Sequence, residues 1–381
     1  MDHSYIYLDY NATTPLDDRV LEEMIPYFGS QFANPSSPHL FGMSIQEVLQ
    51  EATDRVAHLI GAKPNSIIYT SGATEAINLA LKGVFSGEKK HIVTFVTEHS
   101  AMLETCAYLE TVGYSVTYLP VDHEGGVDLE QLKNVVTNKT LLVSAMLVNN
   151  ETGVILPIKE MAEIAHHSDA MMFCDATQAM GKIPVNVKDL KVDLLAFSAH
   201  KFYGPKGIGG LFISKEAKKM MKAQIHGGRQ QGGLRSGTLN VPGIIGTAKA
   251  LILASALMVE EQLRIKELRD LLEIGLLDID GTRINGHLTN RIYSTTNICF
   301  QGVLSERLIL NLGQLAVASG SACNAMVTSP SHVLQAMGLS NVDGLSALRF
   351  SLGRFTTKEE IEKTIELVKT AVHHLRKNNF N

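Results

Sequence analysis

The sequence predicts an α/β protein with a mostly parallel, seven-stranded sheet and a second, smaller α+β domain. From about residue 66, short apolar runs alternate with segments of helical periodicity, which is the order expected of β-α units. The apolar runs are nearly continuous, as is typical of strands that helices cover on both faces. Polar residues directly follow most of these runs, where the carboxyl ends of parallel strands form a binding crevice.

Each expected element rests on a local pattern. Strands are expected at residues 66–70, 91–96, 115–120, 140–147, 170–174, 192–197 and 209–213, and helices at 74–84, 101–112, 129–136 and 158–166. A long helix near 248–277 leaves the large domain, and strands at 293–300 and 347–352 belong to the smaller one. Thr357 and Glu360 form a capping box that starts the last helix. We expect a large domain of residues 15–260 and a small domain of residues 1–14 and 261–381.

Composition excludes several classes of function. The 381 residues are 45% hydrophobic and 19% charged, and the net charge of −5 gives no basic surface for direct nucleic-acid or membrane binding. None of the four cysteines form a C-x-x-C pair, which argues against zinc-ribbon and thioredoxin-like sites and indicates a reducing compartment. Residues 1–5 lack signal-peptide features, and the apolar stretch 250–259 is too short to span a bilayer. We therefore expect a cytoplasmic location and no metal site.

Five of the expected strands end in polar clusters. These clusters are residues 71–75, 97–99, 149–151, 175–178 and 198–201. Because the carboxyl ends of parallel strands meet at one edge of a sheet, the clusters should face a single crevice. This convergence is the main argument from the sequence for an active site.

Lys201 is the first candidate for chemistry, because it stands just past a buried strand among Ser198, His200 and several glycines. An amine in such a crevice can form a Schiff base with an aldehyde cofactor. A surface loop with two solvated lysines, Lys201 and Lys206, is the alternative.

Asp175 ends a buried run and needs a partner there. A protonated pyridine nitrogen suits it, but so does a helix N-cap or a structural ion pair.

The other candidates suit a phosphate and a proton-transfer group. Gly72, Ala73 and Thr74 open a helix directly after a strand, where free N–H groups favour phosphate, although many helices without a ligand start this way. His99 suits stacking on a flat ring and proton transfer near neutral pH, or it is a buried histidine with satisfied hydrogen bonds. The glycine-rich segment 226–238 is either flexible linking sequence or a second anion-binding loop.

Taken together, these motifs resemble those of the cysteine desulfurases of the NifS/IscS group, a branch of the aminotransferase-like pyridoxal phosphate enzymes of fold type I. The resemblance extends over essentially the whole chain. It covers residues 7–15 (YLDYNATTP), 34–37 (NPSS), 70–75 (TSGATE), 97–99 (TEH), 149–151 (NNE), 175–178 (DATQ) and 349–357 (RFSLGRFTT). Each motif is modest alone, but their order and spacing together are highly specific.

The resemblance implies a role toward pyridoxal 5′-phosphate for each candidate. Lys201 would form the Schiff base, whereas Lys206 matches a second family lysine. Asp175 would pair with the pyridine nitrogen and Gln178 would donate to the phenolic oxygen. The remaining cofactor-binding residues would be Ala73, Thr74, His99, Asn150, Ser198 and His200, with Thr238 coming from the other subunit of a homodimer. Asn34 and Arg349 would hold the carboxylate of the substrate, L-cysteine.

The resemblance also implies that Cys323 is the nucleophile, acting with Lys201 and His99. It would attack the γ-sulfur of cofactor-bound L-cysteine, keep the sulfur as a persulfide and release L-alanine, which requires thiolate character and access. The sulfur would pass to an acceptor protein for iron–sulfur cluster assembly, tRNA thiolation or another sulfur-modification pathway. Cys323 is also a candidate transient iron–sulfur ligand.

Two departures from the family pattern and three alternative functions remain. Arg229 replaces a usual glycine and Gln231-Gly232 replaces Glu-Arg, which changes the dimer-side phosphate loop. The sequence ends at Asn381, without the tail that helps IscS-like members dock the iron–sulfur scaffold, which allows a different acceptor. The alternatives are a selenocysteine lyase, a related pyridoxal phosphate aminotransferase, and a weakly active structural partner in sulfur transfer. A pure aminotransferase would not need Cys323.

Overall fold

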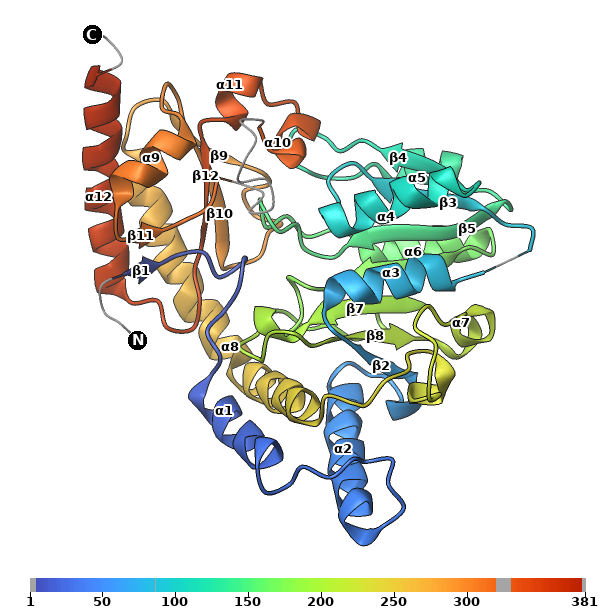
Figure 1. Cartoon of the computed structure of the whole chain (residues 1–381). Coiled ribbons are helices and arrows are strands. Elements are labelled where there is room, and N and C mark those ends of the chain that lie inside the picture. Colours follow the sequence, from blue (N-terminus) through green and yellow to red (C-terminus); the bar gives the residue numbers. More distant parts are fainter. Residues whose placement is uncertain (1–4, 86, 320–329, 379–381) are drawn as a thin grey trace.

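A seven-stranded sheet forms the centre of the computed structural model, which describes residues 5–85, 87–319 and 330–378 (Figure 1). Its strand order is β2 (Ile67–Thr70), β8 (Gly209–Ile213), β7 (Leu194–Ser198), β6 (Met171–Asp175), β5 (Thr140–Met146), β3 (His91–Phe95) and β4 (Ser115–Leu119). Neighbouring strands run parallel, except that β8 is antiparallel to β2 and β7. The predicted mostly parallel, seven-stranded sheet is therefore confirmed.

Helices cover both faces of this sheet and form two cores. On one face lie α3 (Ala73–Gly83), α4 (Ser100–Thr111) and α7 (Lys215–Met220), and on the other α2 (Leu40–Leu59), α5 (Leu129–Val135), α6 (Ile158–His167) and α8 (Val241–Leu277). Successive strand residues point to opposite cores, as the pleat requires. In β6, Met172 and Cys174 pack in one core and Phe173 in the other. Burial on both faces explains why the strands read as continuous apolar runs.

The smaller unit is built around the antiparallel sheet β12 (Ala347–Ser351), β10 (Thr295–Phe300) and β9 (Thr282–Asn285). The helices α9 (Ser305–Leu312), α10 (His332–Ala336), α11 (Asn341–Gly344) and α12 (Lys358–Asn378) belong to the same part of the chain. The capping box at α12 is confirmed, because Thr357 N–H donates to Glu360 Oε2 at 2.9 Å and Glu360 N–H donates to Thr357 Oγ1 at 3.2 Å.

The N-terminal strand joins this smaller unit. β1 (Ile6–Tyr7) pairs in parallel with β11 (Leu315–Ala316), and the segment between β1 and α1 (Asp18–Met24) leads to the large sheet. This pairing supports the proposed grouping of residues 1–14 with the C-terminal part. The proposed boundary at residue 260 falls inside the continuous helix α8. The domain division stays a prediction.

Helix α8 begins at Val241, seven residues before its expected start. The Asn240 side chain accepts a hydrogen bond from Gly243 N–H at 3.0 Å, and Pro242 occupies the first turn, where its missing N–H is harmless. By length and composition α8 could cross a membrane, but 56% of its most apolar 18-residue stretch is buried within the fold. It packs against α2 and α12, as a core helix does.

Candidate active site

A cavity of about 560 Å³ lies at the carboxyl ends of the large-sheet strands. Its walls come from the residues that follow β2, β3, β5, β6 and β7, from residues 11–13 and from β12. All five predicted polar clusters contribute, through residues that include Ser71, His99, Asn150, Asp175 and Lys201. The predicted convergence on one crevice is confirmed.

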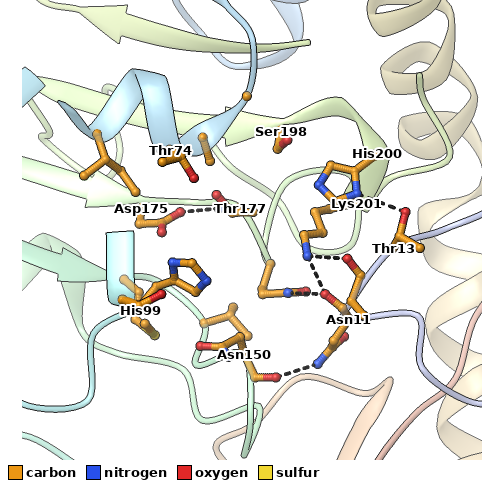
Figure 2. Close-up of a pocket in the computed structure, with 18 of the residues that line it drawn as sticks. Asn11, Thr13, Thr74, His99, Asn150, Asp175, Thr177, Ser198, His200 and Lys201 are labelled. Atoms are coloured by element: carbon orange, nitrogen blue, oxygen red, sulfur yellow. Dashed lines mark hydrogen bonds between the residues drawn. The ribbon is translucent and has the colours of Figure 1, made fainter. Parts of the chain in front are cut away.

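Lys201 extends into this cavity from the short helix η3 (Ala199–Lys201), which follows β7 (Figure 2). Its Nζ atom donates hydrogen bonds to the carbonyl oxygens of Asn11 and Ala12, at 2.6 and 2.8 Å. The N-terminal segment therefore holds the amine inside the cavity. Lys206 also lines the cavity, so it does not belong to a loop away from the site.

Asp175 lies across the cavity from Lys201 (Figure 2). Its side chain is 6% exposed, and Oδ1 accepts a hydrogen bond from Thr177 N–H at 2.9 Å. No ion pair to Asp175 is found among the described residues. Because a buried carboxylate without a cation is unfavourable, this wall fits a cationic group such as a protonated pyridine nitrogen.

His99 lies beside Asp175 and caps the start of α4 (Figure 2). Its Nδ1 accepts a hydrogen bond from Ala101 N–H at 3.1 Å, so the proton of the neutral ring is on Nε2. Burial lowers the pKa of His99; Asp175 opposes this shift and Lys201 reinforces it. At neutral pH the ring is therefore uncharged and keeps one N–H donor.

The start of α3 provides an anion-binding surface. Gly72 precedes the helix and no side chain caps it, so the N–H groups of Ala73 and Thr74 have no partner within the helix. The buried Ser198 lines the same cavity. These donors and the positive end of the helix fit a phosphate group.

His200 and Gly209 complete this anion-binding surface. His200 Nδ1 lies 3.0 Å from Thr13 Oγ1, and burial lowers its pKa to about 4, with neighbouring lysines adding to the shift. His200 is therefore neutral at pH 7. A Cβ atom on Gly209 would lie 2.4 Å from Phe197 O and 2.8 Å from Gly72 Cα, so only glycine lets β8 pass this close to the start of α3.

Arg349, on β12, forms the wall that belongs to the smaller unit. It is 3% exposed; Nη1 donates to Asn150 O at 3.0 Å and Nη2 donates to Asp9 Oδ1 at 2.6 Å. Its buried Nε has no partner within the described part of the chain. A buried guanidinium with an unused donor fits a substrate carboxylate.

Most of the predicted site residues line this one cavity: Ala73, Thr74, His99, Asn150, Asp175, Gln178, Ser198, His200, Lys201 and Arg349. Asn34 and Thr238 are exposed and do not line it. Cys323 lies outside the described residues. The described chain on either side of its segment reaches the cavity wall, because Ala318 pairs with the backbone of Arg349 and His332 lines the cavity.

Segment 226–238, which contains the departures at Arg229 and Gln231-Gly232, contacts the large sheet through Gln231. Gln231 Oε1 accepts from Tyr69 N–H at 2.6 Å and Nε2 donates to Tyr69 O at 2.9 Å, so the side chain continues the hydrogen bonding of edge strand β2. Arg235 also pairs with Glu75 of α3 at 2.8 Å. Arg229 has φ 59°, a left-handed conformation that glycine adopts more easily.

Three residues of the site were missed from the sequence. The Asn11 carbonyl accepts from both Gln178 and Lys201, Lys182 is buried beside Gln178, and Glu151 is fully buried against Ser331. A lysine inside an apolar run was the available signal for Lys182. Asn11 and Glu151 stood in quoted motifs but had no assigned role.

Comparisons with known proteins agree with this geometry. Residues 6–364 match the aminotransferase class-V family. The chain is 47% identical over 377 residues to cysteine desulfurase IscS of Pasteurella multocida (strain Pm70), covering 97% of this chain and 93% of that protein. Its fold is similar to a solved NifS-like protein, with a TM-score of 0.91 and 38% identity over 97% of this chain and 100% of the other. It is also similar to SspA in complex with cysteine, with a TM-score of 0.81 and 34% identity over 92% and 99% of the two chains.

These similarities span nearly the full length of each partner, so they include both the large sheet and the smaller unit. Residues 6–364, which match the family, include every predicted site residue. The predicted family is confirmed. The chain belongs to the class-V aminotransferase family, whose members depend on pyridoxal phosphate, and within it to the cysteine desulfurases.

Proposed function

We propose that the protein takes sulfur from L-cysteine, with pyridoxal 5′-phosphate bound in the cavity, and holds it on Cys323 for transfer to an acceptor protein. The observation that carries this proposal is the single cavity in which Lys201, Asp175, His99 and Arg349 meet. The related SspA structure is a complex with cysteine, which supports L-cysteine as the substrate.

The residues of the cavity fit pyridoxal phosphate. Asp175 would pair with its ring nitrogen, and the open first turn of α3 with Ser198 and His200 would hold its phosphate. His99, Asn150 and Gln178 would make the remaining contacts. When bound, the cofactor supplies an aldehyde that condenses with amines and a ring that withdraws electrons from the bonds of the substrate.

Lys201 and His99 are the groups that move protons. Lys201 Nζ is an amine held inside the cavity and, as a free base, takes a proton from the substrate Cα. His99 carries its proton on Nε2 and is neutral, so it is suited to donate one. Arg349 orients the substrate by binding its carboxylate with the buried guanidinium.

Cys323 receives the sulfur in a step that needs no external oxidant. Its thiolate attacks the substrate Sγ, an S–S bond forms and the Cβ–Sγ bond breaks. The electron pair of the broken bond goes to carbon, which takes a proton and becomes the methyl group of alanine. One thiol and one cysteine thus give one persulfide and one alanine. Ala318 pairs with the backbone of the cavity residue Arg349 and His332 lines the cavity, which supports this role for a segment between them.

A second copy of this chain would complete the site. Thr238 and Asn34 are exposed and outside the cavity. Around Asn34, the chain exposes large apolar side chains: Phe28, Phe32, Leu40 and Met43. Phe32 and Phe41 contact each other edge to face, with ring centroids 5.5 Å apart. Such a cluster is typical of a protein–protein interface, and a homodimer would cover it and place Thr238 at the partner's cavity.

The proposal includes the sulfur acceptor and the cellular location. We propose an iron–sulfur scaffold protein as the acceptor, because the similar curated proteins are IscS desulfurases, and a cytoplasmic location. A tRNA- or DNA-modifying enzyme is the alternative acceptor. Selenocysteine lyase activity is the alternative reaction, since a cavity that holds L-cysteine also accommodates its selenium analogue.

The test is a Cys323→Ser variant assayed for alanine and sulfide with L-cysteine and L-selenocysteine side by side. We expect the variant to bind the cofactor, seen by its absorption, but to release neither product from L-cysteine. Cys299→Ala, which changes a buried cysteine outside the cavity, serves as the control and should remain active. Full activity of Cys323→Ser would contradict the assigned nucleophile, and a Lys201→Ala protein with unchanged absorption would contradict the cofactor lysine.

A further inference from the structure

Lys182 is a buried lysine that the proposed mechanism does not use. It is 8% exposed and does not line the cavity. Its Nζ atom contacts two amide oxygens, donating to Gln178 Oε1 at 2.8 Å and to Asn11 Oδ1 at 3.4 Å. No carboxylate forms an ion pair with it in the described ranges. Burying the charge of a lysine without an acid is unfavourable, so the stability of the fold does not explain why Lys182 is at this position.

The contact with Lys182 fixes the orientation of the Gln178 amide. A lysine presents N–H donors, so it faces the amide oxygen, which leaves Nε2 on the other side. There Nε2 donates to Asn11 O at 2.9 Å, the same carbonyl that accepts from Lys201 Nζ at 2.6 Å. Hydrogen bonds therefore connect Lys182 to the cofactor lysine through Gln178 and Asn11.

We propose that Lys182 is a positioning residue of the cofactor site, which keeps the N–H donors of Gln178 toward the cavity and fixes Asn11 behind Lys201. This inference rests on the proposed function, because Gln178 has a cofactor to contact only if pyridoxal phosphate binds here. Without Lys182, the amide could turn over and present its oxygen instead. Lys182 itself touches neither cofactor nor substrate.

The charges around Lys182 support this role. The pKa of Lys182 is lowered to about 7, chiefly by burial, with the neighbouring cations Lys201 and Arg349 adding to the shift. Lys182 in turn contributes to the lowered pKa of His200 at the anion-binding surface. An anionic cofactor would favour the charged form of Lys182, so its binding should be accompanied by proton uptake near pH 7.

A double-mutant cycle tests the proposal. The dissociation constant of pyridoxal phosphate is measured for wild type, Lys182→Met, Gln178→Ala and the double variant. We expect Lys182→Met to raise it about tenfold in the wild-type background and by a clearly smaller factor in the Gln178→Ala background, where only the charge of Lys182 and its contact with Asn11 are lost. Equal effects in both backgrounds would overturn the proposal. Lys188→Met, at an exposed lysine six residues further on, should bind the cofactor normally.

A second readout separates positioning from packing. In Lys182→Met, the pH titration of the absorption of bound cofactor should have a displaced midpoint, which a packing change alone would not produce. If Lys182→Met does not fold, Lys182→Gln retains a donor of similar length and should stay within about threefold of wild type in cofactor affinity. If wild type binds no cofactor, the proposed function and this inference both fail. If wild type binds the cofactor and Lys182→Met binds it as tightly as wild type and Lys182→Gln do, only the inference fails.

Discussion

Several single residues in or beside the cavity are held in states that are unfavourable in the protein alone. Asp175 is a buried carboxylate without an ion pair among the described residues, Lys182 is a buried amine without an acid, and Arg349 has a buried donor without a partner. A bound ligand would give Asp175 and Arg349 their missing partners, and its binding would offset the cost of burying Lys182. Such conflicts with local stability are expected at functional sites, because the binding energy of the ligand offsets them.

Asp175→Asn should therefore have opposite effects on stability and on cofactor binding. Removing the buried charge should raise the free energy of unfolding of the cofactor-free protein by about 1 kcal/mol or more. The neutral amide cannot stabilise a protonated ring nitrogen, so turnover should fall on the order of a hundredfold. Urea unfolding without cofactor and alanine release with cofactor measure the two effects. Lower stability together with normal turnover would contradict the assigned role.

Lys182 predicts a pH dependence of stability. Its pKa is about 7 in the folded protein and 10.5 for the free side chain, so the unfolded chain binds more protons between these values. The free energy of unfolding should therefore rise with pH in this window, by up to ~1.4 kcal/mol per pH unit. Buried cysteines have raised pKa values and oppose this rise at higher pH, so urea unfolding is compared between pH 7 and 8.5. Lys182→Met should have the smaller slope, and equal slopes would contradict the prediction.

At the scale of elements, the strands of the large sheet were predictable to within one or two residues. They are buried on both faces, so each leaves a continuous apolar run, and Asp175 and Lys201 could be placed because they follow such runs. The strands β1 and β11 have two residues each and depend on pairing between distant segments, so they left no local pattern. Asn11 was missed for the same reason, since its contact with Asn150 joins residues 139 positions apart.

Helix α10 carries a prediction of its own, because its start is anchored beside the cavity. Ser331 Oγ accepts from Val333 and Leu334 N–H, and donates to the fully buried Glu151 at 2.5 Å. Burial raises the pKa of Glu151, and the bond from Ser331 opposes this. Ser331→Ala removes both the helix cap and the hydrogen-bond partner of the buried Glu151. We expect it to lower the free energy of unfolding by about 1–3 kcal/mol, the cost of one unsatisfied buried polar group.

Since Ser331 stands close to the segment that contains Cys323, the expected consequence is specific to sulfur transfer. Ser331→Ala should slow alanine release about tenfold but leave the absorption and affinity of the cofactor unchanged. Ser340→Ala, which removes the corresponding cap of α11 at the surface, is the matched control and should behave as wild type. Loss of cofactor in Ser331→Ala would show that the residue supports the whole cavity instead.

At the scale of the whole molecule, one chain contains the cavity but not all of the proposed site. Residues 11–13, β12 and the loops of the large sheet form its walls, and Asp9, Arg349 and Asn150 link the smaller unit to the sheet. Arg354 adds a second link, because it pairs with Asp17 at 2.7 Å and with Glu261 of α8. The exposed positions of Asn34 and Thr238 remain unexplained in a single chain, whereas a second copy would give both a place.

Dimer formation should therefore depend on the apolar cluster around Asn34, and cofactor affinity should depend on the dimer. Phe32 and Leu40 are 72% and 85% exposed in the single chain. A Phe32→Asp/Leu40→Asp variant should sediment with half the mass of wild type, because the two charges would have to be buried at the interface. It should also bind pyridoxal phosphate about tenfold more weakly, since the partner's Thr238 would no longer reach the cavity. Leu310→Asp changes a leucine that is 81% exposed on α9 and should leave both properties unchanged. A wild-type protein that sediments as a monomer and still binds the cofactor tightly would contradict the shared site, because the cavity of one chain would then be sufficient.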